Sequence, residues 1–320
     1  MHRWTDLSQI PTDLGSTVVT LGNFDGVHRG HQAVLQRLAA EAVARSTLSV
    51  AVTFDPHPIA VLYPDRAPGA ITSLDERLAR IEAAGVDGVL VLEFTREFAQ
   101  QTPEEFVRSV FVDALRARAV VVGRDTRFGV RNSGTVDTLV ALGERLGFEV
   151  VVLDDVGAGH RWSSTQLRIN LAEGDVAAAS EILGRPHAVT GTVVHGDHRG
   201  RLLGYPTANL SQDSQGYIPS DGVYAGWLVR PGLPLDAADR TLPAAISVGT
   251  NPTFNGTQRR VEAYVLDRTD LELYDEYVAI SFIVRLRPTL KFDSVDALIV
   301  QMRQDCADCR EILGTPDPID

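Results

Sequence analysis

Two histidines, His28 and His31, lie three residues apart in a glycine-rich segment, residues 22–31, with the sequence GNFDGVHRGH. The segment follows the first apolar run of the chain and precedes its first helical pattern. Glycines allow a backbone to approach a ligand closely, and the free N–H groups at the start of a helix attract anions. We therefore predict a phosphate site in which both histidines donate hydrogen bonds, with Gly22, Asn23 and Gly30 beside them. The alternative is a turn before a helix, with the histidines as caps or solvated groups.

A second polar segment, residues 163–168, has the sequence SSTQLR. Hydroxyl groups at the start of a helix, followed one turn later by an arginine, can hold a phosphate. The candidate ligands are Ser164, Thr165 and Arg168. Taken alone, this pattern is most often only a helix cap.

A third segment, residues 191–209, is rich in glycine and polar residues. The backbone N–H groups at Gly196, Gly200 and Gly204, together with Arg201, could cradle phosphates in a flexible loop. The alternative is a β-hairpin with a glycine-rich turn. Such a loop would matter here because Lys291 is the only lysine, which excludes a Walker A loop and argues against a Schiff-base lysine.

The composition limits the classes of protein to which the chain can belong. Its 320 residues, 44% hydrophobic and 22% charged, are typical of a soluble globular protein of about two domains. Acidic residues outnumber basic ones by 42 to 30, so we expect no nucleic-acid partner, since such binders usually carry a basic patch. We see no secretory signal and no membrane-spanning run, which predicts a cytoplasmic protein without a membrane partner. The two cysteines, Cys306 and Cys309, suggest incidental surface or half-buried thiols rather than a disulfide framework, a zinc site or a redox pair.

Strand-like and helix-like segments alternate in the first half of the chain and must position the first two polar segments. Apolar runs predict strands over 18–21, 48–54, 86–92, 119–122 and 148–153, and helical patterns cover 30–44, 74–84, 103–117 and 135–147. Repeated strand–helix units with continuous apolar strands imply a parallel sheet covered on both faces. In such a sheet, the loop at 22–31 lies at the carboxyl end of a strand, where ligands bind.

The pattern changes near residues 184–190, after which the segments are short, alternating and separated by glycine and proline. Predicted strands cover 191–194, 222–229, 243–248, 260–266 and 277–286, and a closing helix over 294–310 is capped by Asp293 or Ser294. Several short strands with regular turn signals suggest a small barrel. We therefore predict an α/β domain over residues 1–184 and a β-barrel domain over 185–320.

The first two polar segments together resemble a known superfamily. GVHRGH, residues 26–31, is similar to the His-x-Gly-His signature of nucleotidyltransferases, and SSTQLR resembles their second signature, Ser-Ser-Thr-x-x-Arg. TFDPHP at 53–58 and VVGRDTRFG at 121–129 resemble stretches of the bacterial bifunctional riboflavin kinase/FAD synthetase family. That family usually has an aromatic residue where this chain has Thr126, which leaves a flavin-stacking contact there open.

The second half of the chain resembles the same family. GRLLGYPTAN at 200–209 is a hallmark of its riboflavin kinase domain, and DGVY at 221–224, GTNPTF at 249–254 and EAYVLD at 262–267 also match. The resemblance implies a Rossmann-like nucleotidyltransferase domain followed by a six-stranded antiparallel barrel with a C-terminal helix. It implies that Glu262 is the catalytic base of the kinase and that Thr207 and Asn209 hold Mg²⁺ with the nucleotide.

The resemblance also implies roles in the N-terminal domain. By similarity, His28 and His31 stabilise phosphate and Arg168 binds the ATP phosphates. A weaker set would line the flavin site: Phe54, Asp55, His57, Asp125 and Phe128.

The implied substrates are riboflavin, FMN and ATP, with FAD as the final product and Mg²⁺ as cofactor. Three other functions stay open at this stage: a flavin-binding protein with silent sites, a nucleotidyltransferase for pantetheine phosphate or nicotinamide mononucleotide, and a class I aminoacyl-tRNA synthetase. The kinase-like half argues against the second and the acidic chain against the third. The oligomeric state is not readable from the sequence.

Overall fold

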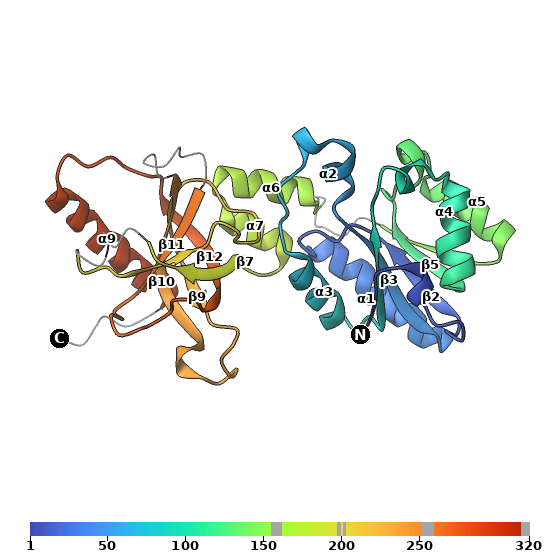
Figure 1. The fold of residues 1–320 in the computed structure, drawn as a ribbon, viewed down its shortest axis with the longest axis horizontal. Coiled ribbons are helices and arrows are strands. Elements are labelled where there is room, and N and C mark those ends of the chain that lie inside the picture. Colours follow the sequence, from blue (N-terminus) through green and yellow to red (C-terminus); the bar gives the residue numbers. More distant parts are fainter. Residues whose placement is uncertain (155–161, 197–199, 201–202, 251–258, 315–320) are drawn as a thin grey trace. The chain divides into compact units, whose positions relative to one another are not determined.

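The computed structural model describes residues 1–154, 162–196, 200, 203–250 and 259–314. Contacts divide the chain into two compact units (Figure 1). The first contains Met1–Gly69 and Ser73–Ser163, and the second contains Ala70–Thr72 and Ser164–Asp320. A short piece of the N-terminal half therefore groups with the C-terminal unit, and so does the chain that directly precedes the predicted boundary at residue 184.

The first unit is built on a six-stranded parallel sheet with the strand order β1-β4-β3-β2-β5-β6. The strands are β1 (His2–Trp4), β2 (Thr17–Leu21), β3 (Leu48–Asp55), β4 (Gly88–Glu93), β5 (Ala117–Gly123) and β6 (Glu149–Leu153). The predicted parallel sheet is confirmed, and the short edge strand β1 is an addition that the sequence pattern did not indicate. The chain runs from β2 outward through β3 to β4, then returns to the other side of β2 for β5. The carboxyl ends of β2 and β5 therefore flank a topological switch point, where α/β sheets bind ligands.

Helices cover both faces of this sheet: α1 (Arg29–Arg45), α3 (Leu74–Ala83), α4 (Pro103–Phe106) and α5 (Val136–Leu146). The short helix α2 (Pro58–Leu62) follows β3 and has no buried residue. Side chains of α1 and α3 pack on Val18, Ala51 and Val89, whereas α4 and α5 contribute to the cluster around Val19, Val50 and Leu90. Neighbouring residues of one strand thus serve opposite cores, which explains why the strands are apolar throughout. The helix predicted over 103–117 continues beyond α4 as a π-helix over Val107–Ala114, where Val107, Val110 and Phe111 stay buried. Short 3-10 turns cover Leu7–Gln9, Pro64–Arg66, Phe98–Gln100 and Val130–Asn132.

The second unit is a closed six-stranded barrel with the strand order β10-β11-β8-β7-β12-β9, preceded by two helices and followed by one. Its elements are α6 (Ser164–Glu173), α7 (Val176–Leu183), β7 (His187–Val194), β8 (Thr207–Leu210), β9 (Gly222–Val229), β10 (Thr241–Thr250), β11 (Arg259–Val265), β12 (Tyr277–Arg287) and α9 (Val295–Leu313), with a 3-10 turn over Ala238–Arg240. Every strand pairs in the antiparallel sense, so the predicted barrel and closing helix are confirmed. Burial alternates along β8 and β11, with Ala208, Leu210, Val261 and Ala263 buried.

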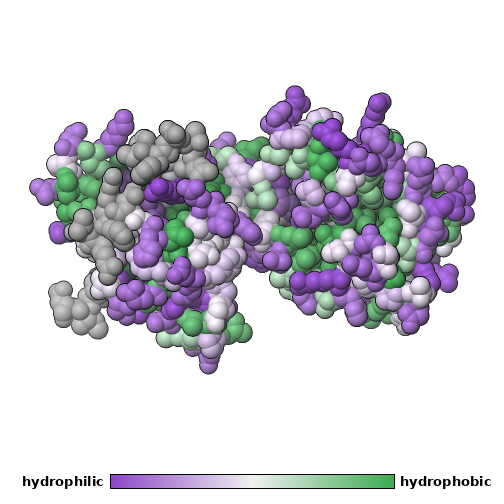
Figure 2. Space-filling view, in the orientation of Figure 1, coloured by the Kyte–Doolittle hydropathy of each residue, from purple (hydrophilic) through white to green (hydrophobic). Residues whose placement is uncertain are grey.

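Helix α9 begins after Ser294, whose side chain accepts the Ala297 N–H, as the sequence indicated. Its two cysteines differ from the expectation of surface or half-buried thiols. Cys306 is 5% exposed and Cys309 is 0% exposed, and both pack with Ala225 and Leu266 against the barrel. Burial raises the pKa of the Cys306 thiol to about 11 and of the Cys309 thiol to about 12, so neither is a reactive thiolate at neutral pH. Figure 2 shows mainly hydrophilic residues on the visible face of each unit, with smaller hydrophobic areas among them.

Candidate active sites

The predicted histidine pair lies at the carboxyl end of β2, at the start of α1. His28 is the N-cap residue of α1, and its ring Nδ1 accepts the backbone N–H of His31 at 3.3 Å. The two imidazole rings stack, with centroids 3.7 Å apart and an interplanar angle of 18°. His28 therefore acts as a helix cap and, at the same time, fixes the position of the second histidine.

Burial makes His31 unusual. Its pKa lies well below the usual value for histidine, first because the ring is desolvated and second because of the neighbouring His28. The ring Nδ1 of His31 is buried and has no hydrogen-bond partner. A neutral imidazole with an unpaired nitrogen can offer a hydrogen bond to a phosphate oxygen.

The loop before the helix has an unusual backbone. Phe24 has φ of 49° and Val27 has φ of 39°, and both side chains are buried. Positive φ is costly for a β-branched residue such as valine, and such conformations persist only where the surroundings hold them. The loop that presents the histidines is therefore held in place by its contacts rather than by local preference.

Asn23 and His57, both predicted site residues, come from different loops and meet in the structure. The side-chain Nδ2 of Asn23 lies 3.4 Å from Nε2 of His57, and the Asn23 carbonyl accepts the Thr53 hydroxyl at 3.2 Å. The other ring nitrogen of His57 accepts the N–H of Ile59 at 3.2 Å and so caps α2. These contacts join the carboxyl ends of β2 and β3.

Arg77 of α3 is a site-region residue that the sequence reasoning missed. Its guanidinium is buried and donates to the carbonyls of Asn23 and Phe54, at 2.9 and 3.1 Å. Asp55 lies 3.7 Å from the same group. Its place in the sequence carried a signal, because Arg77 adjoins Leu78 on the apolar face of α3, where a cation is unexpected.

Two of the predicted flavin-binding residues are parts of the core. Phe54 is 9% exposed and packs on Phe94 and Phe98, while Phe128 is 6% exposed and packs on Phe106. A packing role therefore explains both rings without a ligand.

The last residue of the flavin set, Asp125, lies after β5 next to Thr126, the position where the family usually has an aromatic residue. Asp125 is exposed, and Thr126 is half-buried in a turn where its N–H donates to the Gly123 carbonyl at 3.1 Å.

The second polar segment forms the start of α6, as predicted. Ser164 is its first residue, and Thr165 is exposed while Arg168 is half-buried. Trp162, two residues earlier, lies in the first unit against the start of α1. Its carbonyl is 3.7 Å from the position a side chain would take at Gly30, and its ring lies 5.5 Å from the Arg29 guanidinium. The chain thus leaves the histidine site directly before the hydroxyl residues begin.

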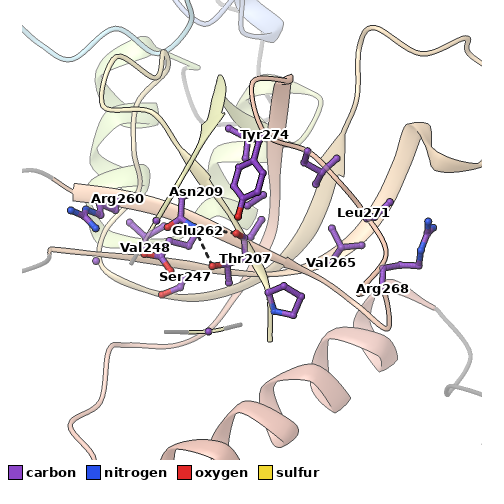
Figure 3. Close-up of a pocket in the computed structure, with 18 of the residues that line it drawn as sticks. Thr207, Asn209, Ser247, Val248, Arg260, Glu262, Val265, Arg268, Leu271 and Tyr274 are labelled. Atoms are coloured by element: carbon purple, nitrogen blue, oxygen red, sulfur yellow. Dashed lines mark hydrogen bonds between the residues drawn. The ribbon is translucent and has the colours of Figure 1, made fainter. Parts of the chain in front are cut away.

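The third polar segment borders a cavity of about 360 Å³ in the second unit (Figure 3). This volume is typical of a small-molecule site. Glu262 of β11 lies in register between Ser247 of β10 and Asn209 of β8. Side chains that face each other across neighbouring strands lie about 5 Å apart, so these three form one polar row on the cavity wall.

Thr207 and Asn209 lie on the same side of β8. The Asn209 amide Nδ2 donates to the Thr207 hydroxyl at 3.2 Å and to the Thr207 carbonyl at 3.1 Å (Figure 3). Because the NH₂ group of Asn209 donates both of these hydrogen bonds, its amide oxygen points away from Thr207. The predicted metal-holding pair and the predicted base are therefore brought together.

Two glycines of this segment, Gly196 and Gly200, also line the cavity. Gly196 packs so closely on Asn209 that an added Cβ would lie 2.6 Å from its Nδ2, and Gly200 is a further lining residue. Gly204 has φ of 85°, a conformation in which glycine is strongly preferred. Arg201 and residues 251–254 of the GTNPTF match lie outside the described residues.

One wall of the cavity comes from residues that the sequence analysis did not single out. Arg268 makes ion pairs with Asp239 at 2.8 Å and Asp270 at 2.7 Å, which raise the pKa of its guanidinium and lower that of Asp270 to about 2. Tyr274 stacks on His195 with ring centroids 3.9 Å apart. Arg268 and Tyr274 both lie in the loop between β11 and β12. Their partners Asp239 and His195 are distant in the sequence, so no local pattern indicates these contacts.

The described residues contain no cluster of three or more His, Cys, Asp or Glu side chains able to hold a metal ion. The cavity lining contains the carboxylates of Glu262 and Glu272 as well as the neutral oxygens of Thr207 and Asn209. Across the same residues, no helix combines the length and apolar character that crossing a membrane requires.

Family models match both halves of the chain. The FAD synthetase model matches residues 10–166, and the riboflavin kinase model matches residues 183–313. The first contains the histidine site, and the second contains the barrel with its cavity.

Relatives are similar over nearly the whole length. A bifunctional riboflavin kinase/FMN adenylyltransferase of Escherichia coli K12 is 36% identical over 314 residues, covering 98% of this chain and 97% of the relative. A protein of the same name from Listeria monocytogenes is 36% identical over 310 residues, covering 96% and 93%. Among solved structures, a protein described as a macrolide-efflux protein from Streptococcus pneumoniae has a TM-score of 0.85 and 33% identity, covering 96% of this chain and 98% of that one. The structural similarity supports the folds described above, and the efflux activity is a description of that protein alone.

Proposed function

This chain belongs to the bifunctional riboflavin kinase/FMN adenylyltransferase family, and from that premise we propose which residues carry out the two reactions. The chain is an enzyme that phosphorylates riboflavin with ATP to FMN and adenylylates FMN with ATP to FAD and pyrophosphate. The kinase activity belongs to the C-terminal part and the adenylyltransferase activity to the N-terminal part. We propose the division between the two activities at residues 184 and 185, near the start of the riboflavin kinase match at residue 183, while the compact C-terminal unit already begins at Ser164.

The position of Glu262 carries the kinase proposal. Its carboxylate lies in register with Asn209 at a cavity wall, beside the glycine-rich segment. In this role Glu262 accepts the proton of the ribityl 5′-hydroxyl as that oxygen attacks the γ-phosphorus of ATP, and ADP leaves. Backbone N–H groups around Gly196 and Gly200 orient the phosphates in place of a lysine.

The oxygens of Thr207 and Asn209 fit Mg²⁺. They are neutral, adjacent on one strand and joined by a hydrogen bond, and Mg²⁺ accepts a few protein oxygens while substrate phosphates supply the rest. When bound, the ion neutralises charge on the nucleotide phosphates. The part of Asn209 in this arrangement is to present its amide oxygen from a fixed position.

Adenylyl transfer needs no protein nucleophile, because a phosphate oxygen of FMN attacks the α-phosphorus of ATP directly and pyrophosphate leaves. The protein contributes positioning and charge stabilisation. We assign hydrogen bonding of the phosphates to His28 and His31, supported by the stacked rings and the unpaired Nδ1 of His31. Arg168, Ser164 and Thr165 would bind the ATP phosphates from α6.

The contribution of other residues is proposed on weaker support. Asn23 with its neighbours Gly22 and Gly30 would line the nucleotide site. Asp55, His57 and Asp125 would border the flavin, while Phe54 and Phe128 would shape its pocket from the core.

The remaining proposals concern partners and location. Small molecules are the partners that the two activities require. We propose no nucleic-acid or membrane partner, in keeping with a chain in which 42 acidic residues outnumber 30 basic ones. We propose a cytoplasmic location, where ATP is made and used. Cell fractionation with an antibody against the chain would test it.

Two variants test the assignment of the two sites. The double variant His28→Ala/His31→Ala and the single variant Glu262→Gln are each incubated with riboflavin, ATP and Mg²⁺, and the flavins are separated by chromatography. We expect the histidine variant to accumulate FMN without FAD. We expect Glu262→Gln to leave riboflavin unconverted but to make FAD from supplied FMN.

Each variant has its intact activity as an internal folding control. If either folded variant lost both activities, the assignment of separate sites would be wrong. If the unaltered protein converted neither flavin, the silent flavin-binding alternative would replace the enzymatic one. Other acceptors, such as pantetheine phosphate, do not fit the riboflavin kinase match over residues 183–313.

A further inference from the structure

A buried guanidinium connects the ends of two neighbouring strands beside the histidine site. Arg77 of α3 is 6% exposed, and its Nη1 lies within hydrogen-bonding distance of three oxygens. These are the Asn23 carbonyl at 2.9 Å, the Phe54 carbonyl at 3.1 Å and the Thr53 hydroxyl at 3.4 Å. Asn23 lies two residues after the end of β2, and Thr53 and Phe54 directly precede Asp55, the last residue of β3. One side chain from a helix therefore holds two carboxyl ends of the sheet together.

Two carboxylates compensate the buried charge. Asp55 lies 3.7 Å from the guanidinium, and the charge of Asp25 also acts on it. Burial lowers the pKa of Arg77, whereas these two acids raise it. The Arg77 Nε is buried without a hydrogen-bond partner, so the arrangement is not optimised for stability alone. A buried cation with an incomplete set of partners suggests that its position serves a further purpose.

The carbonyl that Arg77 holds lies at a strained part of the chain. Asn23 immediately precedes Phe24, which has φ of 49°, and Val27 with φ of 39° leads directly to His28. The Thr53 hydroxyl donates to the same Asn23 carbonyl at 3.2 Å. Loops with such backbone angles stay in place only when several contacts hold them. Arg77 is the contact that joins this loop to a helix and to β3 at once.

We propose that Arg77 is a positioning residue for adenylyl transfer, whose guanidinium fixes the loop of residues 22–28 so that His28 and His31 meet the ATP phosphates. It touches no substrate itself. The proposal rests on the function assigned above to the histidine pair. It adds a residue from α3, outside the two signature segments, to the machinery of the N-terminal reaction.

The chemistry of the contacts explains why arginine is used. A planar guanidinium directs several N–H groups in fixed directions and remains charged when buried. A lysine ammonium could take the place of Nη1 but would bring no second nitrogen towards Asp55, which lies 3.7 Å from Nη2. A methionine would fill much of the space but would form no hydrogen bond to either strand end.

The same helix offers a matched control. Arg80 lies one turn further along α3, is half-buried, and is ion-paired with Glu76 of the same helix at 2.6 Å. Arg80→Met therefore removes an arginine from the same helix without touching the loop. The three variants for the test are Arg77→Met, Arg77→Lys and Arg80→Met.

Steady-state kinetics with FMN and ATP measure the effect on FAD formation, and riboflavin phosphorylation is measured on the same preparations. We expect Arg77→Met to lower kcat for FAD formation about 100-fold, as misplacement of a site by about 1 Å can do. KM for FMN and ATP should change much less, because the lost interaction orients groups for the transition state. Arg77→Lys should retain an intermediate kcat, and Arg80→Met and all kinase rates should match the unaltered protein.

A purely structural role predicts a different result. It would lower the unfolding temperature of Arg77→Met while kcat per folded molecule stayed normal at low temperature, and that outcome would overturn the proposal. If Arg77→Met does not fold, Arg77→Lys decides: an unchanged kcat in that variant refutes a positioning role.

The proposal and the function on which it rests fail in different ways. If His28→Ala/His31→Ala abolishes FAD formation and Arg77→Met does not lower kcat, only the role of Arg77 is wrong. If the histidine variant makes FAD at the normal rate, the assignment of the site itself is wrong and the proposal falls with it.

Discussion

Replacing Gly196 with alanine tests how closely the kinase cavity depends on the position of one amide. A Cβ at residue 196 would lie 2.6 Å from Nδ2 of Asn209 and 2.7 Å from its Cγ and Oδ1. Ordinary van der Waals contact begins at 3.4 Å, so the whole amide group must move by about 0.7 Å. Because a side-chain end moves more readily than a backbone, we expect the protein to fold with a displaced Asn209.

The displacement should impair catalysis more than stability. It weakens the hydrogen bonds from Asn209 to Thr207, which contribute about 1 kcal/mol each, and it moves the amide oxygen proposed to hold Mg²⁺. Displacements of about 1 Å can lower a rate roughly 100-fold, so we expect kcat for FMN formation to fall between about 10- and 100-fold. The Mg²⁺ concentration needed for half-maximal rate should rise.

The assay is the initial rate of FMN formation from riboflavin at several Mg²⁺ concentrations. FAD formation from supplied FMN serves as a control within the same chain. Gly232→Ala is the matched control variant, because its added Cβ meets no atom within 4 Å. Normal kcat and normal Mg²⁺ dependence in Gly196→Ala would refute the reasoning, as would an equal loss of both activities.

Three further predictions concern stability and reactivity. Cys306 and Cys309, with pKa values raised to about 11 and about 12 by burial, should resist iodoacetamide at pH 8 in the folded protein and react after unfolding, as mass spectrometry would show; rapid labelling of the folded protein would contradict this burial. The pKa of His31 lies well below 6.5 in the folded protein, so just below pH 6.5 this imidazole gains a proton only in the unfolded chain. The free energy of unfolding should therefore decrease as the pH falls below 6.5. Unfolding temperatures at pH 7.5 and 5.5 should therefore differ less in His31→Phe than in the unaltered protein. Asp305→Asn should leave the Arg287 guanidinium, now paired at 2.6 Å, without its counter-charge; a cost of about 2 kcal/mol would lower the unfolding temperature by roughly 4–8 °C, and an unchanged value would show that the pair contributes nothing.

The main elements of both units could be predicted from local patterns in the sequence. Continuous valine-rich runs such as residues 48–54 indicated buried parallel strands, and β3 spans Leu48–Asp55. Short alternating segments indicated the barrel. The cap at His28 had been only the alternative to a phosphate site at this glycine-rich turn, and the structure shows that His28 does cap α1.

Features that depend on long-range pairing could not be predicted. Ser247 faces Glu262 only because β10 and β11 pair in one particular register, and a shift of one residue would turn either side chain to the other face. Phe54 lies within the TFDPHP motif and was predicted to line the flavin site, yet it packs against Phe94 and Phe98 in the core. The position of Arg77 on the apolar face of α3 was a local signal, but its partners Asn23 and Phe54 come from distant segments that no local pattern identifies.

The grouping of Ala70–Thr72 with the barrel unit has a consequence for how the chain is made. Ile71 is completely buried, and its carbonyl lies 3.6 Å from the position a Cβ would take at Gly216, roughly 145 residues later in the chain. At bacterial synthesis rates of about 5–20 residues per second, roughly 7–29 seconds pass between the emergence of these two residues from the ribosome. During that time Ile71 has no native partner there, so the N-terminal half cannot reach its final state by folding strictly in the order of translation. Residues 70–72 are therefore synthesised within the first quarter of the chain but reach their native contacts only after the barrel segment around Gly216 has been made.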